Sequence, residues 1–152
     1  MILQQILDNK LTRYEHHFET WQEAIKASAL SMIEEKFIDE TYVDEILACV
    51  EKYGPYIVIA PDIAMPHSTE GSQGVYKTGI GFMKVEVPVH FDLNDPEKDA
   101  RLFFVLASEN HEQHLENMMN LSEMLMEEEI VAALLQAKGD EDLKSIIEQY
   151  KN

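Results

Sequence analysis

Residues 56–67 read YIVIAPDIAMPH, and in this stretch the chain changes from a helical to an extended pattern. It contains two short apolar runs, Tyr56–Ala60 and Ile63–Met65, with a Pro-Asp pair between them. Short apolar runs bounded by turn-forming residues are typical of buried strands. The stretch therefore predicts two buried strands, and it places His67 where the chain leaves the second of them.

Two helices are predicted on the N-terminal side of these strands. Residues 20–23, TWQE, have the form of a capping box, and apolar residues at helical spacing continue from there to about residue 36. A second helix is predicted over Asp39–Tyr53, and a Gly-Pro pair follows it because proline cannot continue a helical turn. Residues 1–19 are weakly patterned, although Leu11–Phe18 could form an edge strand.

Two longer strands are predicted after residue 70. Val75–Val87 has a strand pattern in which Gly79 and Gly81 indicate bends or a close backbone approach. Residues 92–98 are polar and predict a loop. Arg101–Ala107 is apolar on both faces, which is typical of the central strand of a covered sheet.

Three helical patterns complete the chain, at residues 111–126, 128–138 and 140–151. One side of the first helix is expected to carry a set of mainly apolar residues: Leu115, Met118, Met119, Ser122 and Leu125. The methionines of this segment, Met118, Met119, Met124 and Met126, are interpreted as core filler. Helices at both ends with strands between them predict an α/β fold, a layered sandwich of a mixed central sheet flanked by helices, with residues 1–152 as a single domain.

The composition is that of an ordinary globular protein. The chain has 152 residues, of which 45% are hydrophobic and 27% charged. Its longest apolar run, Leu102–Ala107, is too short to cross a bilayer, and the N-terminus lacks the pattern of a signal peptide. The single cysteine, Cys49, fits a reducing compartment and is interpreted as a buried packing residue. We expect a cytoplasmic protein without membrane insertion; the oligomeric state stays open.

The net charge is −17, from 29 acidic and 12 basic residues. A surface of this charge repels nucleic acid and anionic membranes, so neither is expected as a partner. A basic protein would be attracted to it, at a rate that salt should reduce. The charge pattern therefore favours protein partners, although solubility alone would also explain it.

His67 is the first candidate for chemistry. No nucleophile elbow, phosphate-binding glycine loop or dinucleotide fingerprint is present, so no cofactor is predicted. Pro66 fixes the direction in which the chain leaves the strand, and ligands of α/β folds usually bind at strand ends. A neutral imidazole is a good nucleophile near pH 7 and can accept a phosphoryl group on one nitrogen while the other donates a hydrogen bond. A solvated or structural histidine is the competing interpretation.

His114 is the second candidate, at the start of the helix that follows the Arg101–Ala107 strand. The N-terminus of a helix favours an anion because of its unpaired N–H groups and its dipole. If the sheet places this turn beside His67, the second imidazole could donate to the transferred phosphoryl oxygens. The alternative is a histidine that only caps the helix.

Residues 53–67, with their Gly-Pro-Tyr, Ala-Pro and Ala-Met-Pro-His elements, resemble the active-site signature of type-2 enzyme IIA domains. These are the mannitol/fructose-like domains of the phosphoenolpyruvate-dependent sugar phosphotransferase system. Val75–Ile80 resembles their next strand, and His114-Leu115 lies where they carry a second active-site histidine. The details are most similar to the ascorbate-type branch, and the resemblance covers nearly the whole chain.

This resemblance implies a phosphotransferase with a phosphohistidine intermediate. His67 would take the phosphoryl group from HPr and pass it to a cysteine of enzyme IIB, which phosphorylates sugar that enters through the membrane enzyme IIC. His114 would assist without being phosphorylated. The alternative is a regulatory, phosphorylation-sensing module of the same fold, although such relatives usually sit in longer chains. The sequence does not identify the sugar.

Two positions depart from the family pattern. Some relatives have an arginine near the active site where this chain offers only Lys52, and many have glycine or alanine where this chain has Ser68. Ser68 is expected to cap a turn rather than to contact the phosphoryl group.

The other histidines are weaker candidates. His16 and His17 are adjacent and, in a strand, would face opposite ways, and His90 is expected to be solvated. His111 and His114 share a helix face and could bind zinc with Glu112 or His67, but no HExxH or cysteine pattern completes such a site. No metal is therefore predicted.

Overall fold

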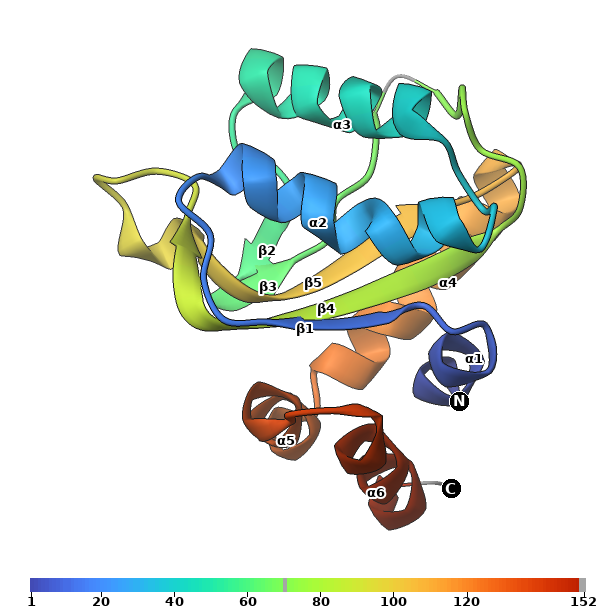
Figure 1. Ribbon diagram of the computed structural model, residues 1–152, viewed down its shortest axis with the longest axis vertical. Coiled ribbons are helices and arrows are strands. Elements are labelled where there is room, and N and C mark those ends of the chain that lie inside the picture. Colours follow the sequence, from blue (N-terminus) through green and yellow to red (C-terminus); the bar gives the residue numbers. More distant parts are fainter. Residues whose placement is uncertain (70, 151–152) are drawn as a thin grey trace.

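A five-stranded sheet forms the middle layer of the computed structural model, which describes residues 1–69 and 71–150 (Figure 1). The strands are β1 (Thr12–Glu15), β2 (Val58–Ala60), β3 (Asp62–Ala64), β4 (Gly79–His90) and β5 (Asp99–Ala107). Their order is β1-β4-β5-β3-β2; the β1–β4 and β3–β5 pairs are parallel and the other two are antiparallel. The predicted mixed sheet, with the 101–107 strand at its centre, is confirmed.

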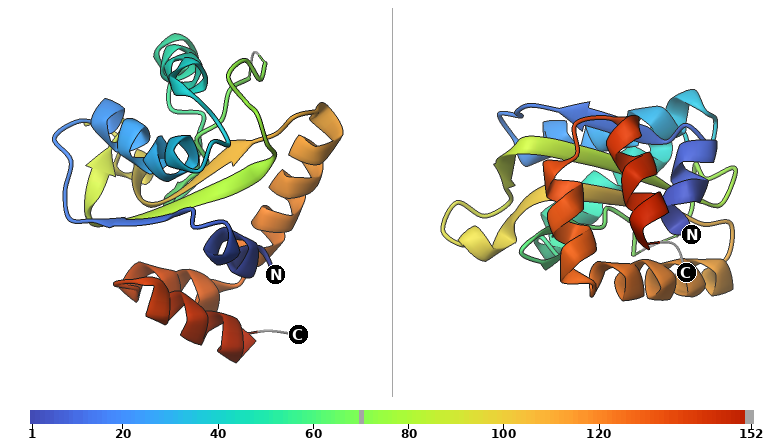
Figure 2. Two further views of the ribbon diagram at one scale, coloured as in Figure 1. Left: turned by 45° about the vertical axis from the view of Figure 1, so that its right-hand side comes forward. Right: turned by 90° about the horizontal axis from the view of Figure 1, so that it is seen from below.

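Helices cover both faces of this sheet, as Figures 1 and 2 show. They are α1 (Ile2–Asp8), α2 (Trp21–Glu34), α3 (Glu40–Tyr53), α4 (His111–Leu125), α5 (Glu128–Gln136) and α6 (Asp140–Tyr150). α2 and α3 lie on one face, and α1 lies with α4, α5 and α6 on the other. None of the helices in the described part of the chain is long and apolar enough to span a membrane. The predicted layered α/β sandwich is confirmed; α1 was not predicted.

The predicted helix starts are confirmed by their caps. Thr20 Oγ1 accepts a hydrogen bond from the backbone N–H of Glu23 at 3.2 Å, and Asp39 Oδ1 accepts one from the N–H of Thr41 at 2.9 Å. Such side chains satisfy donors that the first helical turn leaves unpaired. α3 ends at Gly54, whose φ of 82° is readily adopted by glycine.

Close packing of α2 on the sheet depends on two glycines of β4. A Cβ atom at Gly79 would lie 2.6 Å from the ring of Phe37, and one at Gly81 would lie 2.9 Å from Cγ of Met32. Both side chains belong to α2 or to the turn that follows it. The neighbours that require glycine here are therefore side chains, and not the backbone approach that was predicted.

Several details of the elements differ from the sequence prediction. β4 begins at Gly79 rather than at Val75, which forms an isolated bridge with Ile38. The edge strand predicted over 11–18 is confirmed as the shorter β1. The loop at 92–98 contains a short 3₁₀ helix, η1 (Pro96–Lys98), capped by Asp95.

The side of α4 that was predicted to be apolar is only partly covered: Met118 and Leu125 pack against the core, and other residues of this side do not. Leu115 and Met119 are 52% and 59% exposed, and Met126 is 79% exposed, whereas Leu121 is fully buried. α4 packs against β5 and α5, and its Leu115 side faces a cavity at the edge of the sheet. The interpretation of these methionines as core filler is wrong for Met119 and Met126.

Gly79→Ala should destabilise the protein by about 1–3 kcal/mol, because the new methyl group would overlap the rigid Phe37 ring. Gly139→Ala is the matched control: a Cβ atom there meets nothing within 4 Å, and its φ is not positive. We expect the control to be neutral or to stabilise by about 0.4–1 kcal/mol. Urea unfolding measures both changes, and equal stability of the two variants would contradict the close packing of α2 on β4.

Candidate active site

The parallel pairing of β3 and β5 places the ends of these two strands at the same edge of the sheet. His67 follows β3 after Met65 and Pro66, and a backbone hydrogen bond of 3.0 Å from the N–H of Leu106 to Pro66 O extends the pairing to this point. α4 begins three residues after Ser108, beyond the end of β5. The rings of His67 and His114 lie together, with 5.4 Å between their centroids.

One nitrogen of His67 is fixed by the backbone. Nδ1 lies 2.6 Å from the carbonyl oxygen of Met65. A carbonyl can only accept, so Nδ1 carries the proton and Nε2 keeps its lone pair. The ring of Tyr56 stands edge-on to the imidazole at 5.3 Å, and its hydroxyl donates to the carbonyl of His67. These contacts hold the ring in one tautomer and one orientation.

Both imidazoles favour the neutral form. His67 is 8% exposed, and burial lowers its pKa below 6.5, opposed in part by the hydrogen bond to Met65. Burial also lowers the pKa of His114, and the nearby His67 and His111 lower it further. A neutral His67 has an electron pair available for an electrophile at physiological pH.

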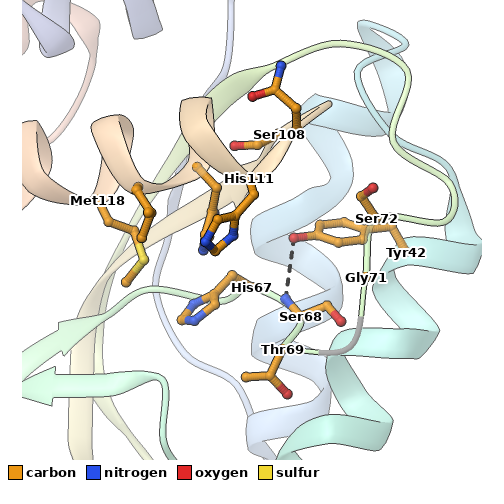
Figure 3. A pocket seen from close by; sticks show the side chains of 12 residues that line it. Tyr42, His67, Ser68, Thr69, Gly71, Ser72, Ser108, His111 and Met118 are labelled. Atoms are coloured by element: carbon orange, nitrogen blue, oxygen red, sulfur yellow. Dashed lines mark hydrogen bonds between the residues drawn. The ribbon is translucent and has the colours of Figure 1, made fainter.

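Tyr42 of α3 joins the two strand ends through one hydroxyl group. This hydroxyl donates to Leu106 O at 2.6 Å and accepts from the N–H of Ser68 at 3.3 Å, the contact drawn as a dashed line in Figure 3. Burial raises the pKa of Tyr42 to about 12, so the hydroxyl keeps its proton. The segment that follows His67 is therefore tied to the end of β5.

Cys49 lies beneath the same segment. It is buried, and its Sγ is 3.7 Å from Oγ of Ser68 and 3.6 Å from Oγ1 of Thr69. Its predicted role in buried packing is confirmed. The two roles weighed for Ser68, a turn cap or a phosphoryl contact, stay predictions.

A cavity of about 440 Å³ opens beside His67 (Figure 3). The residues that line it are Tyr42, His67, Ser68, Thr69, Gly71, Ser72, Ser108, Asn110, His111, His114, Leu115 and Met118. None of these is Asp, Glu, Lys or Arg, although the chain as a whole carries 29 acidic residues. Lys52 is not among them; it is exposed, and its Nζ lies 5.1 Å from the centroid of the Tyr53 ring. The described lining, with hydroxyl and imidazole groups and no carboxylate, suits an anion.

The helix beside the cavity begins at His111, as the predicted range 111–126 has it. His114 is therefore the fourth residue of α4, and its N–H bonds to Asn110 O within the helix. Asn110 is the N-cap, and its Oδ1 accepts from the N–H of Gln113 at 2.9 Å. The alternative that His114 only caps the helix is therefore wrong. His111 and His114 are three residues apart and share one face of α4, and both line the cavity.

Tyr42 and Ser108 are among the polar residues of the cavity that were not predicted from the sequence. Tyr42 lies within a helical pattern that gives no sign of its distant hydrogen bonds. Ser108 is buried, and its Oγ has no hydrogen-bond partner in the described part of the chain. Ser108 could have been proposed from the sequence, because it is a hydroxyl residue directly after an apolar strand.

The other candidate residues lie outside the cavity or form no further site. His16 and His17 are exposed after β1, and His90 at the end of β4 bonds through Nδ1 to Asp99 Oδ1 at 2.8 Å. The expectation that His90 is solvated agrees with its 55% exposure. Within residues 1–69 and 71–150, no three His, Cys, Asp or Glu side chains are arranged to hold a metal ion.

The sequence matches enzyme IIA components of the phosphotransferase system. The family model "Phosphoenolpyruvate-dependent sugar phosphotransferase system, EIIA 2" matches residues 5–150. The mannitol-specific cryptic phosphotransferase enzyme IIA component of Escherichia coli K12 is 36% identical over 132 residues, which are 87% of this chain and 88% of that protein. The ascorbate-specific PTS system EIIA component of the same strain is 31% identical over 147 residues, 95% of this chain and 93% of that protein. The relatives thus include a mannitol-specific and an ascorbate-specific component.

Solved structures agree with the sequence matches. The solution structure of the E. coli mannitol-specific cryptic enzyme IIA has a TM-score of 0.84 at 33% identity, over 98% of this chain and 99% of that one. A complex of enzyme IIAMTL and phosphorylated enzyme IIBMTL from E. coli has a TM-score of 0.78 at 23% identity, over 92% and 95%, which shows a shared fold. The chain therefore belongs to the EIIA 2 family of the phosphoenolpyruvate-dependent sugar phosphotransferase system.

Proposed function

We propose that the chain carries a phosphoryl group on Nε2 of His67, which it accepts from phospho-HPr and passes to a cysteine of enzyme IIB. The observation that supports this most directly is the state of His67. Burial favours the neutral form of its ring, Met65 sets its tautomer, and the described residues that line the cavity beside it include no carboxylate. These are the properties that an acceptor of a phosphoryl group needs.

The transfer step balances without a cofactor. The lone pair of Nε2 forms the new N–P bond, and the electron pair of the old bond stays on the donor's nitrogen. The proton on Nδ1 of His67 remains hydrogen-bonded to Met65 O, so the positive charge that develops on the ring faces a carbonyl dipole. In the onward step, a thiolate of enzyme IIB attacks the same phosphorus and His67 returns to its neutral form.

His114 is assigned the second role in this proposal. Its ring lies 5.4 Å from that of His67, and it lines the same cavity near the N-terminus of α4. From there a nitrogen can donate a hydrogen bond to phosphoryl oxygens as charge develops on them. His114 is not itself phosphorylated in this scheme.

The surface around the cavity suits protein partners. Leu115 and Met118 line the cavity, and Leu115 is half exposed, as is Met119 one turn further along α4. Apolar residues within a strongly acidic surface favour partners with an apolar centre and a basic rim. HPr and enzyme IIB are the proposed partners, with IIC reached through IIB, and all meet this chain in the cytoplasm. A solved relative of the same fold is a complex with phosphorylated IIB.

A regulatory module that is phosphorylated on His67 and acts through protein contact is the second candidate. It would use the same cavity and the same histidine. The two functions differ in the fate of the phosphoryl group, because a regulator would keep it when enzyme IIB is added.

Incubation with phosphoenolpyruvate, enzyme I and HPr should add one phosphoryl group to the wild-type chain. The adduct should be labile in acid and stable in alkali, and intact mass measurement detects it. His67→Ala should take up none, while His90→Ala should behave as the wild type. A wild-type chain without the adduct would sink the phosphocarrier function, and an adduct retained in the presence of IIB would favour the regulator.

His114→Gln should slow phosphoryl transfer to and from His67 by about 100-fold, the usual cost of removing one preorganised donor. Rapid-quench measurements with phospho-HPr give the rate. The circular dichroism spectrum should stay that of the wild type, because Asn110 caps α4. A variant that is unfolded, or one that transfers at the wild-type rate, would contradict the proposed role.

His67 should titrate below 6.5 in the folded protein, because burial disfavours its charged form. NMR of the imidazole protons measures this midpoint, and a value at or above 6.5 would contradict a neutral, buried acceptor. The unfolded chain binds the proton first as pH falls, so His67 lowers folding stability below about pH 6.5. His67→Gln should remove this part of the acid sensitivity.

A further inference from the structure

Ser108 carries a buried hydroxyl group that the folded chain does not satisfy. The residue is 8% exposed, and its Oγ has no hydrogen-bond partner within the described residues. Buried hydroxyl groups are nearly always hydrogen-bonded, because a lost partner is not replaced by water. An unpaired hydroxyl at a site of this kind indicates a partner that arrives from outside the chain.

The position of Ser108 in the fold indicates the charge of that partner. Ser108 lines the same cavity as His67 and His114 (Figure 3), between the end of β5 and the first turn of α4. α4 has 15 residues, so its N-terminal dipole adds a positive potential at this end of the cavity. Among the described residues that line the cavity, none carries a carboxylate. The missing partner is therefore an acceptor with negative charge.

The backbone around Ser108 is held in place. Leu106 bonds to Pro66 O through its N–H and to Tyr42 through its carbonyl, and the N–H of Glu109 donates to Thr78 Oγ1 at 3.0 Å. Rotation about one side-chain bond is the remaining freedom of the hydroxyl. A rigidly placed donor of this kind loses little entropy when it binds an acceptor.

Three other hydroxyl groups of the cavity are already engaged. The Tyr42 hydroxyl donates to Leu106 O, and those of Ser68 and Thr69 contact the sulfur of Cys49. Ser108 is thus distinguished from these three residues by an Oγ without a partner.

We propose that Ser108 is a further catalytic residue, whose hydroxyl donates a hydrogen bond to an oxygen of the phosphoryl group on His67. The proposal rests on the proposed function of His67. A phosphoryl dianion offers charged oxygens, and hydrogen bonds to charged acceptors are stronger than neutral ones, above all away from water. The bond is absent in the unloaded chain and forms as the phosphoryl group arrives, so it favours the phosphorylated state over the free state.

Ser31 provides a matched control. Its Oγ is also buried and lacks a partner in the described part of the chain, but it lies on α2 and does not line the cavity. Ser31→Ala and Ser108→Ala therefore remove the same kind of group. In the unphosphorylated protein, both variants should be at least as stable as the wild type, because each loses an unsatisfied hydroxyl.

The two variants should differ once the phosphoryl group is present. We expect Ser108→Ala to slow transfer from phospho-HPr by about 10- to 100-fold, and to lower the equilibrium occupancy of His67 at a fixed ratio of phospho-HPr to HPr. Ser31→Ala should match the wild type in both measurements. Rapid-quench kinetics and intact mass spectrometry at equilibrium provide the readings.

Three outcomes would overturn the proposal or its basis. If the wild type is phosphorylated on His67 and Ser108→Ala transfers as fast, Ser108 has no role and the proposed function stands. If unphosphorylated Ser108→Ala is clearly less stable than Ser31→Ala, the hydroxyl has a structural partner and the assignment is wrong. If the wild type takes up no phosphoryl group, the proposed function itself fails.

Discussion

The parallel pairing of β3 with β5 is the constraint on which the rest of the site depends. Strands that run in the same direction end at the same edge of a sheet, so the segments that leave them become neighbours. His67 follows one of these strands, and Ser108 and α4 follow the other. The remaining contacts of the site, from the Tyr42 bridge to the position of His114, refine an arrangement that this pairing has already made.

Sequence patterns predicted what local physics determines. We could predict the capped starts of α2 and α3 and the apolar strand β5, because each depends on residues that are close together in the sequence. The exposure of one side of α4 could not be predicted, because an apolar helix face has the same sequence pattern whether or not another element covers it. For the same reason His67 and His114 could be named as candidates, whereas the contacts of Tyr42 and the unpaired Ser108 depend on segments that meet only in the folded chain.

The electrostatics of the site contrast with those of the whole protein. The chain carries a net charge of −17, yet the described side chains that line the cavity include no Asp, Glu, Lys or Arg. Burial lowers the pKa of His67 and of His114, so both rings favour the neutral form. An anionic group can therefore be received locally, while the acidic exterior discourages free polyanions and attracts basic proteins.

The burial of His67 limits how the protein can be used. The ring is 8% exposed and faces the cavity at the end of α4, so donor and acceptor would have to reach it over the same surface. Under the proposed function, two partner proteins cannot be bound there at once. The chain would then work as a ping-pong shuttle, in which each partner must leave before the next can dock. The flux through such a shuttle is capped by the dissociation rates of its complexes, which sets an upper bound on useful affinity.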